Sequence, residues 1–457
     1  MYYEPVSVEG DTCEGPVNTT YLSGKHGAES VSGIHELRSD VFLGIRLTVL
    51  FCLPFILADA AFYQLQILAT GGSTPVSTVV FKITLLLALS AAALLRGRIR
   101  NPRLSKFALV FVAYLIIAAL YQYFVLDVEV TDILISYNTF YLLPILNVLA
   151  LSIPLNISDR LIMRLLLALF IICAWLGFAQ YVTQQPIVAT SSSDGYFQVR
   201  IWHNPNGGVK AFSLFLYPER FGGFATIIAC LALAMCARRR KLLVALPLLV
   251  LSVLACWIST ARADLVGLVC ALTTSVVLTF GKRSGRTKWL PFAFLLIGLL
   301  VGIYAYSNSM SGGNNLSITD TSSFTERLNE WKYYLSMFSA DHWSNALFGF
   351  GISQSERLNA NSVVAIDNIY LATILHIGIV GLMILMAILW RLWEEIRKRA
   401  ESEKNILISA VAAYYSTLLC VGLFTQAVAA ATAALLLFTL SAGTVSLLKT
   451  HGSGVQS

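Results

Sequence analysis

Residues 323–382 read SFTERLNEWKYYLSMFSADHWSNALFGFGISQSERLNANSVVAIDNIYLATILHIGIVGL and set a long polar segment directly against an apolar run. The polar part carries Arg327, Trp331 and Lys332, and the apolar run starts after Asp367. Long ordered connections in a protein are usually functional. We therefore predict a loop outside the membrane that binds a substrate, with Asp367 at the point where the chain re-enters the membrane.

The composition of the whole chain indicates a polytopic membrane protein. Of its 457 residues, 57 % are apolar and only 12 % are charged, which is about half the charged fraction of soluble domains. A helix needs about 20 apolar residues to cross roughly 30 Å of hydrocarbon. We predict an all-α protein of about twelve transmembrane helices, over the runs 41–68, 77–95, 107–126, 131–153, 161–182, 221–237, 242–258, 265–280, 289–306, 367–390, 405–424 and 428–448.

Basic residues predict the orientation of these helices. Four basic clusters follow the second, sixth, eighth and tenth runs, at 96–106, 238–241, 282–288 and 391–404. With twelve spans, all four clusters and both termini lie on one face, and the excess of Lys and Arg marks that face as cytoplasmic. The net charge of +7 is therefore interpreted as a topology signal and not as a nucleic-acid site.

The predicted chain has four parts. Residues 1–40 form a polar cytoplasmic tail, 41–306 hold spans one to nine, 307–366 form the long outer loop, and 367–457 hold spans ten to twelve with a short cytoplasmic tail. Within the loop, Ser323 and Glu326 have the spacing of a helix capping box. Apolar residues at helical spacing follow, which predicts an amphipathic helix on the membrane surface: Leu328, Trp331, Leu335 and Phe338.

The sequence predicts no disulfide framework and no metal site, and it predicts one ion pair with a structural role. Seven of the eight cysteines lie inside apolar runs without Cys-x-x-Cys spacing, so no disulfide framework and no metal site is expected. The predicted outer face has no acidic cluster that would hold Mg²⁺. Asp59 and Lys82 fall at similar depth in the first two spans, and because ionisable residues inside spans are usually paired, we predict a structural ion pair between them.

Three pieces of sequence, in order, give the chain a resemblance to the O-antigen polymerase and O-antigen ligase superfamily of bacterial envelope glycan assembly. The first is HNPNG, His203 to Gly207, before the sixth span. The second is the turn Ser259-Thr260-Ala261-Arg262. The third is the outer loop, with Arg327 and Trp331, then LFGFG at 347–351 and DNIYLATILHIGIVGL at 367–382. The resemblance covers roughly residues 195–385.

The resemblance implies a glycosyltransferase of the C type in the bacterial inner membrane, without a metal or other cofactor. It implies transfer of a glycan from undecaprenyl diphosphate at the periplasmic face, with the lipid-linked oligosaccharide, membrane lipids and a chain-length regulator as partners. In family ligases the position of Asp367 is usually His, before Asn. The pair here is Asp367-Asn368, which favours a polysaccharide polymerase. The usual family Glu is His376 here, and no role is transferred to it.

The chemistry of such a transfer suggests roles for the polar residues. Arginine donates two hydrogen bonds to one phosphate and stays charged, so Arg262 and Arg327 are expected to stabilise the leaving diphosphate. Asp367 is expected to act as general base towards the acceptor hydroxyl. Six further residues are predicted to bind the substrate, some of them only because of their place in the resemblance. They are Arg200, His203, Asn204, Arg220, Trp331 and Asn368.

Structural roles remain open for the same residues, and other functions remain open for the chain. Arg262 could extend to the membrane interface, Asp367 could cap span ten, and Gly349 and Gly351 could serve only a turn. The rival functions are an O-antigen ligase acting on lipid A–core, a polytopic transporter or flippase, and a structural subunit. Transporters often show two matching halves, and none are evident here.

Overall fold

The computed structural model describes residues 39–53, 79–96, 102–130, 132–134, 137, 141–152, 157–185, 209–215, 218–237, 242–259, 262–280, 285–310, 334, 338, 343–351, 368–403 and 405–423. Residues 1–43 and 44–457 form two compact units. The described part of the first unit, residues 39–43, is helical. The elements of the second unit are helices, and everything below concerns that unit.

The expected all-α membrane architecture is confirmed in its coarse form. Among the described residues, four helices are long and apolar enough to cross a membrane: α4 (Pro102–Leu126), α7 (Asp159–Thr183), α8 (Pro218–Ala237) and α15 (Ile369–Glu403). Shorter apolar helical segments, of 10–17 residues, lie in or overlap α3 (Val79–Arg96), α9 (Leu242–Ile258), α10 (Arg262–Phe280), α11 (Leu290–Met310) and α16 (Ile406–Tyr415). Eleven of the twelve expected runs contain a described helix, and 428–448 lies outside the described residues. The number twelve stays a prediction.

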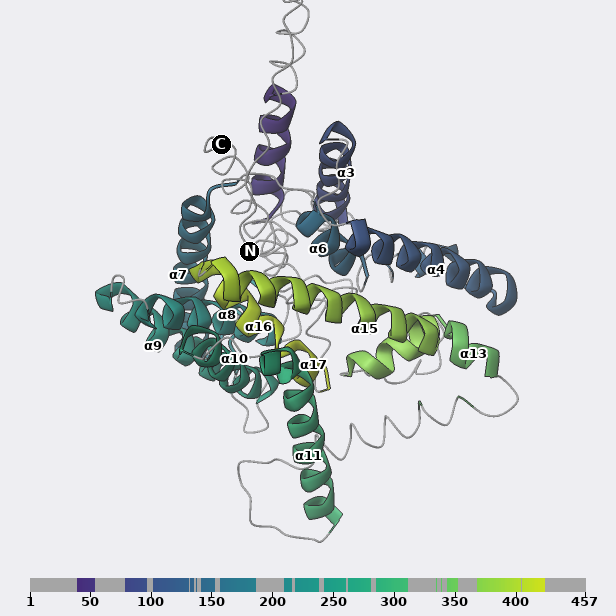
Figure 1. Ribbon diagram of the computed structural model, residues 1–457. Coiled ribbons are helices and arrows are strands. Elements are labelled where there is room, and N and C mark those ends of the chain that lie inside the picture. The colour runs from purple at the N-terminus through teal and green to yellow at the C-terminus, as the bar shows by residue number, and fades with distance from the viewer. Residues whose placement is uncertain are drawn as a thin grey trace, which may run out of the picture. The chain divides into compact units, whose positions relative to one another are not determined.

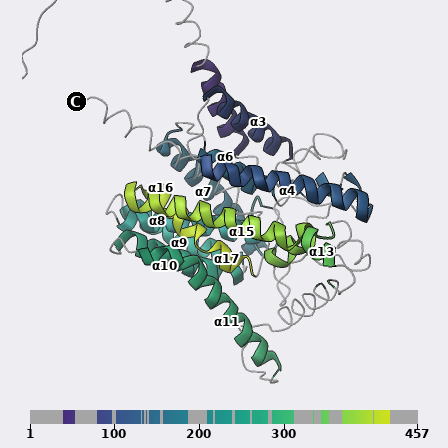
Figure 2. The same cartoon turned by 45° about the vertical axis from the view of Figure 1, so that its right-hand side comes forward.

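Helix α8 is the centre of a close-packed group of helices. It packs against α9, α10 and α16, and these four helices lie together in both ribbon views (Figures 1 and 2). Its buried residues are mostly small, among them Gly222, Gly223, Ala225, Ala229 and Ala232. Small side chains let helix backbones approach closely where hydrophobic burial alone does not hold helices together. We call α8, α9, α10 and α16 the central group.

A second group forms around α15. This helix packs against α4 and against the short helix α13 (Trp343–Phe348), which also touches α4. Its 35 residues correspond to about 52 Å at 1.5 Å per residue, well beyond the thickness of the hydrocarbon layer. The helix therefore continues past the expected span 367–390, through the last basic cluster of the sequence, and it is interrupted once, at Gly378.

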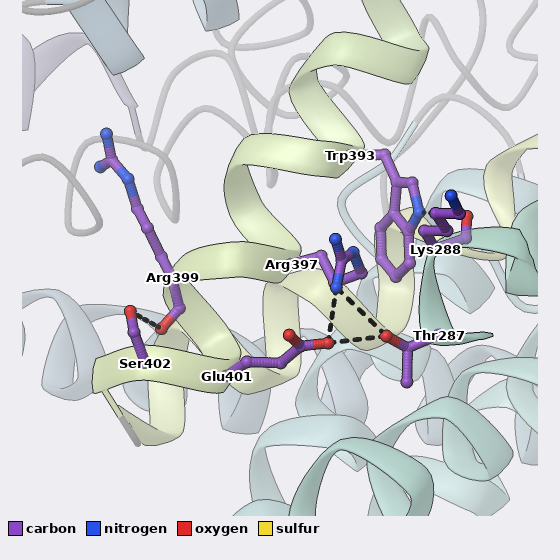
Figure 3. Close-up of polar contacts among 7 residues, drawn as sticks. All are labelled: Thr287, Lys288, Trp393, Arg397, Arg399, Glu401 and Ser402. Atoms are coloured by element: carbon purple, nitrogen blue, oxygen red, sulfur yellow. Dashed lines mark hydrogen bonds and ion pairs between the residues drawn. The ribbon is translucent and has the colours of Figure 1, made fainter. Parts of the chain in front are cut away.

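The C-terminal part of α15 is fastened to the connection between α10 and α11. That connection includes the 3-10 helix η1 (Gly285–Trp289). Arg397 Nη1 donates to Glu401 Oε1 at 2.7 Å and to Thr287 Oγ1 at 3.2 Å, and Thr287 Oγ1 donates to Glu401 at 2.6 Å (Figure 3). The indole N–H of Trp393 donates to the carbonyl of Lys288 at 3.0 Å. We call Thr287, Arg397 and Glu401 the η1 clamp.

The basic residues in the cluster 391–404 were predicted only as topology signals, and the structure shows that some of them also hold helices together. Arg397 and Arg399 are both buried, and each is ion-paired within α15, to Glu401 and to Glu395. Breaking a buried ion pair by removing one partner is far more costly than losing an exposed pair, because a buried charge is left uncompensated.

We expect Arg397→Ala to destabilise the protein by roughly 3 kcal/mol, since it leaves Glu401 and Thr287 without their shared donor. Glu394→Gln is the control on the same helix. It removes the pair with Arg391, whose side chain is 53 % exposed, and should cost less than about 1 kcal/mol. The measurement is thermal unfolding of the purified protein in detergent. Equal melting temperatures for the two variants would contradict a stabilising role of the clamp.

Candidate functional site

The predicted site residues on the central group lie at one end of it. Helix α9 ends at Ile258, a tight turn follows, and α10 begins at Arg262. Helix α8 begins at Pro218 beside this turn, because the space next to its Gly222 is occupied by the side chains of Ser259 and Asp264. Arg220, in the first turn of α8, is half-buried. We call this end, where α8 begins, α9 ends and α10 begins, the arginine end.

The chain that enters α8 is held by hydrogen bonds to the side chain of Gln180 on α7 and to the backbone at the end of α9. Gln180, near the end of α7, accepts from the N–H groups of Phe212 at 3.1 Å and Ser213 at 2.7 Å, and it donates to the Ser213 carbonyl at 3.2 Å. The N–H of Ala211 donates to the carbonyl of Ile258 at 3.2 Å. The residues that directly follow the HNPNG motif are therefore held where α9 ends.

Asp264 is a buried acidic residue at the arginine end that the sequence analysis did not single out. It is 3 % exposed, and its Oδ2 atom has no hydrogen-bond partner in the described part of the chain. It stands in the first turn of α10, just before the predicted span 265–280.

Two glycines of α8 make room for this carboxyl group. A Cβ atom at Gly222 would overlap Asp264 Oδ2 and would lie 2.9 Å from Ser259 Oγ. A Cβ atom at Gly223 would lie 3.0 Å from the hydroxyl of Tyr414 on α16. No larger residue fits without displacing these polar groups. We call Gly222 and Gly223 the glycine seam.

The LFGFG motif of the outer loop packs into the interruption of α15. Gly378 has φ 72° and ψ 177°, a conformation that is essentially restricted to glycine, and Gly349 has φ 80°. A Cβ atom at Gly378 would overlap the backbone of Leu347, and one at Gly349 would overlap the backbone of His376. The loop backbone and the helix backbone are thus in direct contact. For Gly349, a role in a turn was left open. The residue also allows the loop backbone to come into contact with the backbone of α15.

Groups outside α15 satisfy the carbonyls at its interruption. Where a helix is broken, the carbonyls before the break lose their intrahelical donors. Three donors replace them: the N–H of Phe350 to Leu375 at 2.7 Å, the side-chain amide of Gln122 to His376 at 2.6 Å, and the hydroxyl of Tyr114 to Ile377 at 2.6 Å. Tyr114 also donates to the carbonyl of Leu347 at 2.8 Å. We call this arrangement the α15 interlock.

Part of the expected amphipathic helix is also attached to α15. Tyr334 and Phe338, four residues apart, pack with Phe350 against Leu371 and Leu375 in the first turns of α15. Tyr334 is almost fully buried. Arg327 and Trp331, a short distance before Tyr334 in the chain, lie outside the described residues.

The start of α15 is linked to α10 by the short helix α17 (Leu418–Val421). The N–H of Ile369 donates to the carbonyl of Gly422 at 3.0 Å, and Tyr370 donates through its hydroxyl to the carbonyl of Leu419 at 2.6 Å. On the other side, Val421 touches Gly267 of α10. Gly267 is five residues, or about 7.5 Å, from the first residue of α10. One bridging helix thus connects the arginine end to the residues that follow Asp367.

Asn368 caps α15. Its side-chain oxygen accepts hydrogen bonds from the N–H groups of Tyr370 at 2.9 Å and Leu371 at 3.1 Å, and the residue is buried. The cap that was an alternative role for Asp367 is thus supplied by its neighbour. The Asn368 oxygen is occupied by the cap, which leaves its amide N–H₂ for a ligand.

The structure places some predicted site residues and not others. Arg220 and Asn368 are placed as described above, and Arg262 is placed by its backbone at the start of α10. The remaining predicted site residues lie outside the described residues: Arg200, His203, Asn204, Arg327, Trp331 and Asp367. Asp59 also lies outside them, so the ion pair with Lys82 stays a prediction. Asp264 had one sequence signal, an acidic residue directly before an apolar span.

We expect Gly378→Ala to destabilise the protein by roughly 3 kcal/mol or more, because it combines a forbidden backbone conformation with overlap at Leu347. Gly44→Ala is the matched control, since Gly44 is helical and nothing lies within 4 Å of its added Cβ atom. That change should be neutral or slightly stabilising. Thermal unfolding in detergent measures both, and a Gly378→Ala protein as stable as Gly44→Ala would disprove the interlock.

Comparison with known proteins gives one family match. A search of curated proteins returned no match. Residues 247–386 match the family model described as O-antigen ligase, Wzy_C. The match runs from α9 through α10 and the outer loop to the part of α15 that contains Gly378, and it overlaps most of the expected stretch 195–385. Residues 247–386 of this chain are therefore similar to the Wzy_C domain, which is consistent with the O-antigen polymerase and ligase superfamily of membrane proteins.

Proposed function

We propose that this protein is a polysaccharide polymerase. It transfers a glycan from undecaprenyl diphosphate onto a lipid-linked repeat unit at the outer face of the bacterial inner membrane. The observation that supports the proposal is the link through α17, which contacts both α10, the helix that begins at Arg262, and the start of α15 at Ile369. The family match covers both motifs.

The proposed chemistry has two parts, stabilisation of the leaving diphosphate and deprotonation of the acceptor hydroxyl. Arg262 and Arg327 hold the diphosphate and stabilise the negative charge that it gains when the bond between the sugar C1 and the phosphate oxygen breaks. Asp367 accepts the proton of the acceptor hydroxyl, whose oxygen forms the new bond to C1. Arg220 adds positive charge, and the N-termini of α8 and α10 favour an anion at the same end.

The choice of polymerase over ligase rests on the Asp367-Asn368 pair. A histidine at the first position is neutral or positive near pH 7, whereas an aspartate is a carboxylate base without further tuning. Ligase activity is the second candidate, because the matching family model is described as O-antigen ligase. The two functions differ only in the acceptor, so the glycan products separate them.

We expect Arg262→Ala, Arg327→Ala and Asp367→Asn each to lower glycan formation roughly a hundredfold or more, the range found when one transition-state contact is removed. The measurement is the glycan profile of a deletion strain complemented with each variant, with membrane protein levels checked. Single repeat units on the carrier lipid are the expected result. Long chains that stay on the carrier would indicate a ligase, and wild-type profiles from all three variants would refute the site.

A further inference from the structure

The burial of Asp264 requires an explanation that packing alone does not give. Its carboxyl group is enclosed between the glycine seam and the turn that ends α9, and Oδ2 has no hydrogen-bond partner in the described part of the chain. An ionised carboxylate without a partner is strongly disfavoured in such a place, so the group carries a proton. The neutral carboxyl is then a hydrogen-bond donor at the arginine end.

The charged and titratable groups around Asp264 support this protonation. No ion pair of Asp264 with a basic residue occurs among the described residues. Glu219 acts on it electrostatically from α8, three and four residues before the glycine seam and therefore on the same helix face. The groups contributed by the packed elements are Glu219 and Arg220 of α8, Cys256 of α9, Arg262 of α10 and Tyr414 of α16.

Neutral Asp264 raises the net positive charge at the arginine end. Lys210, which precedes Ala211, contributes a positive charge there together with Arg220 and Arg262, and Glu219 contributes one negative charge. A neutral Asp264 leaves this net positive charge intact, whereas an ionised one would lower it by one. An anion such as a diphosphate is attracted more strongly in the first case than in the second.

We propose that Asp264 is a positioning residue for the diphosphate of the lipid carrier and that it works as a neutral acid. Its side chain fills the space at the glycine seam between α8 and the start of α10, the two elements whose backbones carry Arg220 and Arg262. Uncharged, it fills this space without lowering the positive charge of that end. This inference rests on the proposed function, because the ligand is the diphosphate group of that reaction.

The first experiment measures the protonation of Asp264 directly. Infrared spectra of the purified full-length protein near pH 7 should contain a carbonyl band of a protonated carboxylic acid that Asp264→Asn removes. Asp127→Asn is the control, because Asp127 is exposed and has φ 54°, a conformation that asparagine adopts well. It should leave the band unchanged. If Asp264→Asn does not change the spectrum in this region, the inference is overturned.

The second experiment measures binding of undecaprenyl diphosphate in detergent from neutral pH up to the pH at which the infrared band of protonated Asp264 disappears, with uncharged undecaprenol as the reference ligand. Wild type and Asp127→Asn should bind roughly tenfold more weakly once that band is lost. Asp264→Asn, which has the same shape but cannot ionise, should bind as wild type does at low pH and should not weaken. Thermal unfolding of each variant confirms that it is folded.

The outcomes separate the inference from the function on which it rests. One outcome is that undecaprenyl diphosphate binds better than undecaprenol while Asp264→Asn still binds it more weakly at high pH. In that case Asp264 is not the titrating group, and only this inference fails. The same holds if Asp264→Asn abolishes binding, because the carboxylate would then be the active form. If no variant prefers the diphosphate to undecaprenol, the proposed function fails and the inference fails with it.

Discussion

The interrupted helix α15 imposes the constraint on which the rest of the candidate site depends. In a membrane protein, a backbone carbonyl without a donor costs several kcal/mol, so a broken helix survives only where other groups supply the missing hydrogen bonds. Here the outer loop supplies one donor through Phe350, and α4 supplies two through Gln122 and Tyr114. The loop is thereby fixed to the helix that begins next to Asp367. The same contacts that stabilise the helix therefore position the loop.

The arginine end is built on a different principle, which is close approach of helices without bulky side chains. Gly222 and Gly223 admit Asp264 and Tyr414 into the contact between α8, α10 and α16. Polar groups buried in such a contact are costly and are usually functional when they occur within or beside membrane spans. The helix α17 then connects α10 to the start of α15. Two differently built regions thus share one structural link.

Much of the helical plan could be predicted from the sequence, because apolar runs of about 20 residues have few alternatives in a membrane. The boundaries were less predictable. Helix α15 continues to Glu403 because Arg397 and Arg399 find acidic partners one turn away, and a hydropathy pattern does not contain that information. The cap by Asn368 instead of Asp367 was likewise undetermined, since both residue types cap helices well.

The candidate site was predictable only as a set of motifs. The turn before Arg262 and the pair Asp367-Asn368 were visible in the sequence, and the family match includes both. Asp264 was missed because its significance depends on Gly222, which is 42 positions away in the chain and adjacent in space. The interlock was missed because a left-handed glycine inside a helix leaves no mark in a run such as HIGIVGL.

The central claim, that this protein joins lipid-linked glycans, is tested most directly by reconstitution. The purified protein would be placed in lipid vesicles with the undecaprenyl diphosphate-linked repeat unit of its host, without other proteins, and the lipid-linked products would be resolved by size. The account predicts a ladder of longer glycans that remain on the carrier lipid. Unchanged repeat units, or transfer only when lipid A–core is supplied, would contradict it.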